Sequence, residues 1–97
     1  MYNILNLEDS NITEQELYNK LKNYDGLKLS KDYYKKLILP DNCIYLELNH
    51  IYDCPLENLP LLKKLVLGYS YEQEIKDLPE SLEILEIYSN YFTPFNI

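Results

Sequence analysis

A three-residue unit with leucine or isoleucine at both ends recurs along this chain. The copies are Leu46-Glu47-Leu48, Leu65-Val66-Leu67 and Leu85-Glu86-Ile87, separated by 19 and then 20 residues. Repetition at a spacing of about 20 residues is typical of solenoid proteins, in which each repeat contributes one short strand. A unit this short cannot bury its own apolar side chains, so the repetition predicts a stack of units that cover one another.

The residues around each unit recur at fixed offsets as well. An apolar residue stands three positions before the unit, a tyrosine four positions after it and an apolar residue eight positions after it, while a Leu-Pro pair leads into it. We expect these side chains to fill the interior of the coil, because alternate residues of a strand point to opposite faces. They are Cys43, Leu62 and Leu82; Tyr52, Tyr71 and Tyr91; Leu56, Ile75 and Phe95; and the pairs Leu39-Pro40, Leu59-Pro60 and Leu78-Pro79.

Two further copies extend the array towards the N-terminus. Leu27-Lys28-Leu29 comes 19 residues before Leu46-Glu47-Leu48. The segment from Tyr2 to Leu7 is a shorter version of the same unit, with Leu5 and Leu7 on one face of a predicted strand.

Between these two copies the sequence predicts one amphipathic helix. Thr13 is a favourable N-cap, and Glu16 three residues later completes a capping box. Leu17 and Leu21 follow at helical spacing and predict the buried face. We expect Gly26 to close the helix, because glycine tolerates the positive φ of a helix C-terminus.

These patterns predict an α/β solenoid. We expect a short leucine-rich-repeat arc of about five parallel strands, with one N-terminal helix and mostly irregular or 3₁₀ connections. A single domain is expected over residues 1–97, with a strand-helix repeat at 1–25 and shorter repeats at 26–97. All five prolines fall outside the units, in the connections and after the last unit, where the missing N–H disfavours long helices.

The last repeat resembles a known family. Its residues Leu78-Pro79-Glu80-Ser81-Leu82-Glu83-Ile84-Leu85-Glu86-Ile87, followed by Tyr91 and Thr93-Pro94-Phe95, are similar to the FNIP repeat, a leucine-rich-repeat variant of about 22 residues. The resemblance covers residues 39–97 well and 26–38 loosely, with tyrosine where the family usually has phenylalanine. Such repeats are known mainly from social amoebae and from giant viruses of amoebae, often behind an F-box. No F-box-like segment precedes them here, so we do not expect an adaptor role in ubiquitin ligation.

Charge and cysteine content argue against several classes of protein. The net charge is −7, there is no arginine, and residues 41–97 hold ten acids against three lysines. A nucleic-acid partner is not expected, because proteins that bind nucleic acids normally carry a basic surface. No apolar run is long enough to span a membrane, no signal peptide is recognisable, and two cysteines make no disulfide framework. We therefore expect a reduced, cytoplasmic protein that binds neither nucleic acid nor membrane.

No set of residues predicts catalysis or metal binding. Cys43 takes an inward position that leucine fills in other repeats, so we interpret it as a buried apolar thiol. Cys54 has no helix N-terminus or cation beside it to lower its pKa, and Cys43, His50 and Cys54 make a poor zinc site without a CxxC pair. Glu47 and Glu86 lack a cleft that would separate their pKa values. We expect no enzyme, no metal and no cofactor.

The outward side of the sheet is the predicted binding site. Apolar side chains gather there at positions that normally face solvent, with two acidic residues around them. Interface centres favour aromatic and apolar anchors inside a charged rim, although scattered apolar residues are also normal on a surface. The predicted anchors are Tyr45, Val66, Ile84 and Tyr88, and the predicted rim is Glu47 and Glu86.

We therefore expect a non-enzymatic protein–protein interaction module that binds its partner through the exposed face of a parallel sheet. Two alternatives stay open. One is an acidic mimic of nucleic acid that inhibits a basic protein, and the other is a self-assembling structural protein.

The C-terminal end is a second predicted contact surface. Tyr91, Phe92, Phe95 and Ile97 crowd into the last residues, with no polar capping repeat after them. The last unit of a solenoid needs a cover for its apolar surface and its open strand edge. A homodimer joined at this edge, a different partner, or the tail folding back over the last strand would each provide that cover.

Overall fold

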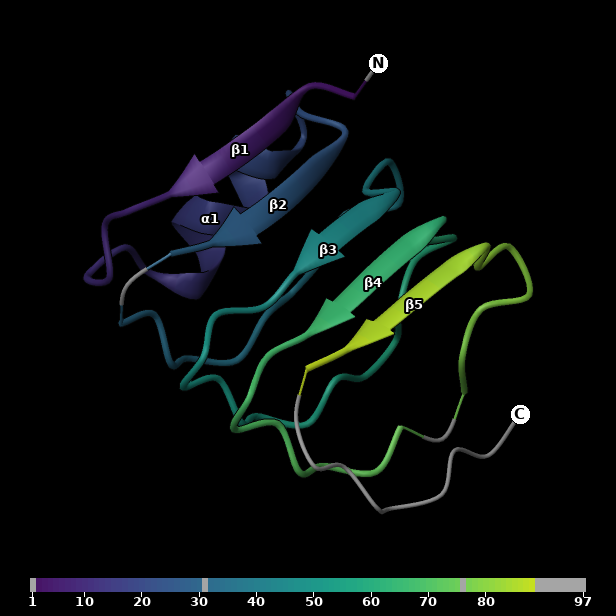
Figure 1. Cartoon of the computed structure of the whole chain (residues 1–97). Helices are drawn as coiled ribbons and strands as arrows, with labels where there is room; N and C mark the ends of the chain where they lie inside the picture. Colours follow the sequence, from purple (N-terminus) through teal and green to yellow (C-terminus); the bar gives the residue numbers. More distant parts are fainter. Residues whose placement is uncertain (1, 31, 76, 89–97) are drawn as a thin grey trace.

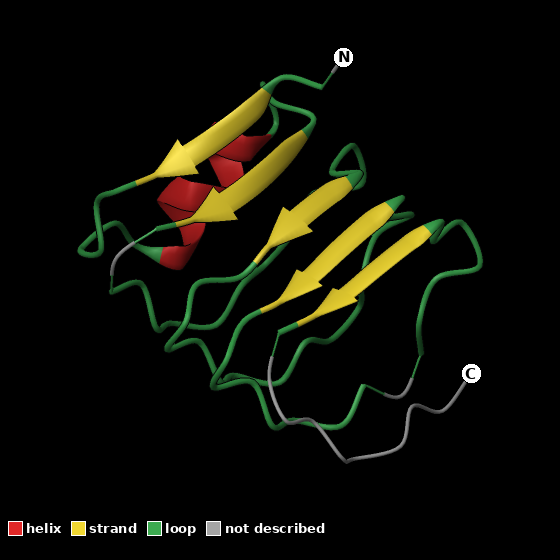
Figure 2. Ribbon diagram, in the orientation of Figure 1, coloured by secondary structure: helices red, strands yellow, loops and turns green. Residues whose placement is uncertain are grey.

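The computed structural model describes residues 2–30, 32–75 and 77–88 of the chain. Within these residues it has five strands and one helix (Figure 1). They are β1 (Ile4–Leu7), α1 (Glu14–Leu21), β2 (Gly26–Leu29), β3 (Tyr45–Glu47), β4 (Lys64–Leu67) and β5 (Ile84–Ile87). The strands form one parallel sheet in chain order, β1-β2-β3-β4-β5, and the remaining connections are irregular (Figure 2). The predicted short solenoid arc of five parallel strands with one helix is confirmed.

The register of the sheet follows the sequence repeat. Leu46 of β3 pairs with Leu27 on one side and with Leu65 on the other, and Leu65 pairs with Leu85. Equivalent residues of successive units therefore stand side by side, in columns that run across the strands. A slip of one residue would turn every leucine to the opposite face, so the buried leucines fix this register.

One apolar core runs through the whole coil. The inward leucines of β1 to β4 are buried in it, together with the tyrosines that follow β2, β3 and β4 at the predicted offset. The fully buried members are Leu17, Leu21, Leu27, Tyr33, Cys43, Leu46, Tyr52, Leu62, Leu65, Leu67, Tyr71 and Ile75.

The helix α1 covers the inner side of β1 and β2, behind these strands in Figure 1. Its N-terminus has the predicted capping box: the Glu16 backbone N–H donates to Thr13 Oγ1 at 3.1 Å, and the Thr13 N–H donates to Glu16 Oε1 at 3.0 Å. Leu17 and Leu21 are buried as the helical spacing predicts. In the first unit the helix therefore supplies the apolar cover that residues of irregular connections supply in the later units.

The predicted role of Gly26 as the end of the helix is wrong. The helix ends at Leu21, its C-cap is Lys22, and Gly26 is the first residue of β2 without a positive φ. A Cβ atom at Gly26 would lie 2.5 Å from Tyr45 Cβ and 2.6 Å from Tyr45 O. Gly26 is therefore required for the close approach of β2 and β3, a constraint that arises 19 residues further along the chain and not in the helix.

The buried tyrosines differ in how their hydroxyl groups are satisfied. Tyr33 Oη donates to the Lys36 carbonyl at 3.2 Å, and Tyr71 Oη accepts from the Leu56 N–H at 3.2 Å. Tyr52 Oη has no hydrogen-bond partner in the described part of the chain. Burial raises the pKa of Tyr33 to about 12 and also raises the pKa of Tyr52, so both phenols are neutral at physiological pH.

The first prediction compares Tyr52→Phe with Tyr33→Phe. Removing the Tyr52 hydroxyl relieves an unsatisfied buried polar group, so we expect unfolding free energy to stay the same or rise by up to about 1 kcal/mol. Removing the Tyr33 hydroxyl deletes a hydrogen bond and leaves the Lys36 carbonyl without it, which should cost about 1 kcal/mol. Urea denaturation followed by circular dichroism measures both, and a larger loss for Tyr52→Phe would show that its hydroxyl has a partner.

Candidate protein-binding face

The side of the sheet opposite α1 carries the outward side chains of every strand, and we call it the outer face. Three of its columns cross the sheet within the strands or just after them. The first holds Ile4, Gly26, Tyr45, Lys64 and Ile84; the second Asn6, Lys28, Glu47, Val66 and Glu86; the third Glu8, Ser30, Asn49, Gly68 and Tyr88. The register places the predicted anchors and rim residues together on this face.

The predicted residues differ in exposure. Ile84 and Tyr88 are 49% and 54% exposed, whereas Tyr45, Glu47 and Glu86 are half-buried. Val66 is only 4% exposed although it lies outside the inner core cluster. The expectation that Val66 faces solvent is wrong, because the longer outward side chains around it, those of Glu47 and Glu86 in its own column among them, cover it. Val66 is therefore a buried residue beneath the exposed side chains of the outer face.

Each rim carboxylate is held by a tyrosine and a lysine. Tyr45 Oη donates to Glu47 Oε1 at 2.6 Å, and Lys28 Nζ lies 3.7 Å from Glu47 Oε2. Two strands away the pattern recurs, with Tyr88 Oη donating to Glu86 Oε1 at 3.5 Å and Lys64 Nζ 3.8 Å from Glu86 Oε2. Both lysines come from the preceding strand, so these contacts join neighbouring units across the face.

The two carboxylates act electrostatically on the tyrosines beside them. Burial and the hydrogen bond to Glu47 raise the pKa of Tyr45, and the charge of Glu86 raises the pKa of Tyr88. A nearby negative charge disfavours ionisation of a phenol. Both phenols therefore stay protonated and act as hydrogen-bond donors to the two carboxylates.

An aromatic row follows the carboxyl ends of β3, β4 and β5. The rings of His50 and Tyr69 stack with centroids 4.8 Å apart, and Tyr69 lies 6.3 Å from Tyr88 in a tilted arrangement. The sequence reasoning missed Tyr69. His50 and Tyr69 each stand two residues after the repeated unit, so the same column logic would have placed them side by side.

A hollow of about 510 Å³ lies at the carboxyl end of the outer face, and we call it the outer-face hollow. Val66, Asn49 and Gly68 are buried residues of its lining, and Lys28, Glu47 and Tyr88 are among the longer side chains around them. The Asn49 side chain is turned inward: Nδ2 donates to the Tyr33 carbonyl at 3.0 Å, and Oδ1 accepts from the Ile51 N–H at 3.1 Å. The floor therefore offers little free hydrogen-bonding capacity.

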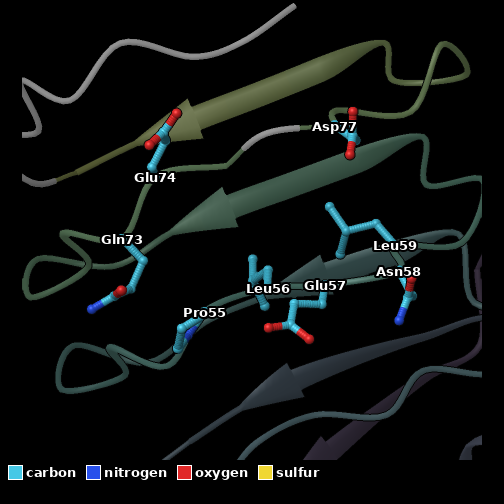
Figure 3. Close-up of a pocket in the computed structure, with 8 residues that line it drawn as sticks. All are labelled: Pro55, Leu56, Glu57, Asn58, Leu59, Gln73, Glu74 and Asp77. Carbon is cyan, nitrogen blue, oxygen red and sulfur yellow. The ribbon is translucent and has the colours of Figure 1, made fainter.

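A second hollow of similar volume, about 510 Å³, lies on the back of the coil between two connections (Figure 3). Its acidic residues Glu57, Glu74 and Asp77 are spread around the opening in Figure 3 and do not point to a common centre. Within the described residues no group of three histidine, cysteine or acidic side chains is arranged to hold a metal ion.

The two cysteines and the histidine have different environments. Cys43 is fully buried, its Sγ donates to the Tyr45 carbonyl at 3.4 Å, and burial raises the pKa of its thiol to about 11. Cys54 is half-buried, with its Sγ donating to the Tyr34 carbonyl at 3.1 Å, and His50 is exposed on the aromatic row. A thiol with a raised pKa is protonated at neutral pH and is a poor nucleophile.

Comparison with known proteins returns nothing: no family model, no curated protein and no solved structure matches this chain. In the described part of the chain, no helix is long and apolar enough to cross a membrane. The predicted C-terminal contact residues Tyr91, Phe92, Phe95 and Ile97 lie outside the described residues.

The second prediction concerns Val66 and Ile84. Val66→Lys places an ammonium group in a buried site, so we expect it to cost about 1–3 kcal/mol of unfolding free energy. Ile84→Lys lies on the same face at an exposed position and should change stability by less than about 0.5 kcal/mol. Thermal denaturation of both variants checks this, and equal melting temperatures would mean that Val66 is open to solvent.

Proposed function

We propose that this chain is a non-enzymatic protein-binding module that uses its outer face. The observation that carries the proposal is that one face of a regular sheet presents exposed Ile84 and Tyr88 and half-buried Tyr45, with exposed Tyr69 beside Tyr88. Large apolar and aromatic side chains at the centre of a surface, with charged groups around them, are the composition of a protein interface.

The charged groups on the outer face fit the same role. The pairs Lys28–Glu47 and Lys64–Glu86 are longer than hydrogen bonds and partly exposed. Such pairs contribute little to folding stability. They support specificity instead, because charges at the edge of an interface select partners and orient them during encounter.

The resemblance of the last repeats to FNIP-type leucine-rich repeats supports the same reading, since repeat solenoids present extended binding surfaces. The free thiols of Cys43 and Cys54 support a reducing compartment such as the cytoplasm. Catalysis is not part of the proposal.

The third prediction tests the face with the variant Ile84→Lys/Tyr88→Lys. Both residues are exposed, so the variant should melt within a few degrees of the parent protein, while proteins retained by immobilised parent from its native cell lysate should be lost. Quantitative mass spectrometry of the retained proteins measures the effect. Leu61→Lys is the matched control, because Leu61 is also exposed but precedes β4 outside the outer face.

Retention by the parent protein, the double variant and the Leu61→Lys control also distinguishes the proposed function from its alternatives. Unchanged retention by the double variant would contradict binding through the outer face. Retention by all variants that collapses between low and physiological salt would instead identify an acidic mimic, since its binding rests on screened charge.

Self-association is a second candidate, favoured by one observation at β5. The inward residue Ile87 is 38% exposed, although Leu67, its partner in β4, is fully buried. No described strand pairs with the far edge of β5. A second copy placed there by a two-fold axis would cover the β5 edge of each copy, and no further copy could then add at that edge.

The fourth prediction is that Ile87→Lys abolishes any dimer. Light scattering of the parent protein at low micromolar concentration should give twice the monomer mass if β5 is a dimer edge, and the variant should give the monomer mass. Leu61→Lys again controls for loss of an exposed apolar residue. A monomeric parent protein would contradict this second candidate.

A further inference from the structure

The outer-face hollow combines an apolar floor with a carboxylate at its edge that has one oxygen free of hydrogen bonds from the described residues. Val66 is buried, and the amide of Asn49 is engaged inside the coil. Gly68 keeps the floor low, since even a Cβ atom there would collide with the Asn49 carbonyl oxygen. The floor therefore suits an aliphatic segment of a ligand and offers it few hydrogen bonds.

Glu47 is the polar group with spare capacity. Its Oε1 is engaged by the Tyr45 hydroxyl at 2.6 Å, but its Oε2 receives no hydrogen bond from any described residue. Lys28 Nζ stays 3.7 Å away, beyond hydrogen-bond distance, and its side chain is half exposed. A carboxylate oxygen without a hydrogen-bond donor, on a half-buried glutamate, favours a ligand that brings N–H groups and a positive charge.

Tyr88 is on the lining of the same hollow as Glu47 and adds an aromatic surface. Its ring belongs to the aromatic row with Tyr69 and His50. Aromatic faces attract cations, and a planar guanidinium stacks on them better than an ammonium does. The excess of acids over lysines in residues 41–97 and the net charge of −7 also favour a basic partner.

From these features we infer that the outer-face hollow takes an arginine side chain of a basic protein partner. The methylene groups of the arginine lie on Val66, the guanidinium donates to Glu47 Oε2, and Tyr88 packs against its plane. The displaced Lys28 ammonium turns to solvent. This inference rests on the proposed function and specifies which residue of the partner the face selects.

The experiment titrates the ¹⁵N-labelled chain with the blocked tripeptide Gly-Arg-Gly and follows the backbone amides by NMR. The expected result is a set of shifts centred on Glu47, Val66 and Gly68. The lysine tripeptide should bind more weakly, because an ammonium has no planar face to stack on the Tyr88 ring. The citrulline tripeptide, which keeps the planar shape without the charge, should shift these amides least.

Matched variants assign the contact. Glu47→Gln should weaken binding of the arginine peptide at least about tenfold, the loss that corresponds to one charge-assisted hydrogen bond. Glu83→Gln removes the same charge from an exposed position outside the hollow and should leave the affinity within about twofold of the parent. Equal binding of the arginine and citrulline peptides, or equal losses in the two variants, would overturn the inference.

The two proposals fail separately. If the Ile84→Lys/Tyr88→Lys variant loses its retained proteins while the arginine peptide leaves the hollow unshifted, the outer face binds protein without an arginine contact. If the peptide shifts the hollow while retention is unchanged, the arginine subsite stands and the outer face is not the protein-binding surface.

Discussion

In this fold, the inward side chains of each unit are buried by contact with the neighbouring units. Each strand has three or four residues, and its inward leucines are covered only when the next strand stands beside them in register. Leu27, Leu46 and Leu65 are fully buried because each is flanked on both sides, whereas Leu85 at the outermost described strand is only partly buried. In a solenoid each unit is covered only by its neighbours, so the inward leucine of the outermost described strand is less buried than those of the inner strands.

The same register leaves the outer face free to vary in chemistry. Its side chains do not build the core, so the columns hold charge pairs, aromatic rings and a valine without disturbing the inner leucines. Tyr45 and Tyr88 nevertheless link the two properties, since each donates to the glutamate of its own unit. Lys28 and Lys64 extend these contacts to the preceding strand. The outer face is thus ordered by contacts between repeats, even where it contributes little to stability.

The sequence predicted what depends on periodicity and missed what depends on side-chain size. Five strands, their order and pairing, the buried tyrosines and the capping box of α1 all follow from spacing. Gly26 was misread, because the atom that excludes a side chain there belongs to Tyr45 on the next strand. Val66 was read as exposed, because a column pattern gives the direction of a side chain and not the reach of its neighbours. Tyr69 was not predicted, because it and its partner His50 lie one residue beyond the last outward column, that of Asn49, Gly68 and Tyr88.

Two of these misreadings, Val66 and Tyr69, fall in one region, on or just after β4 between β3 and β5. Inner positions have to meet one requirement, which is that the side chain is apolar. This requirement recurs in every unit, so it can be recognised from a single sequence. The outer-face hollow arises instead where the repeat is broken by residues of unequal size: Asn49 turned inward, Gly68 without a side chain, and Tyr88 in the same column. A solenoid of identical units would have a uniform outer face with no hollow. Departure from the repeat is therefore what makes one position on this surface chemically distinct, and it is there that recognition of a particular partner side chain has a physical basis.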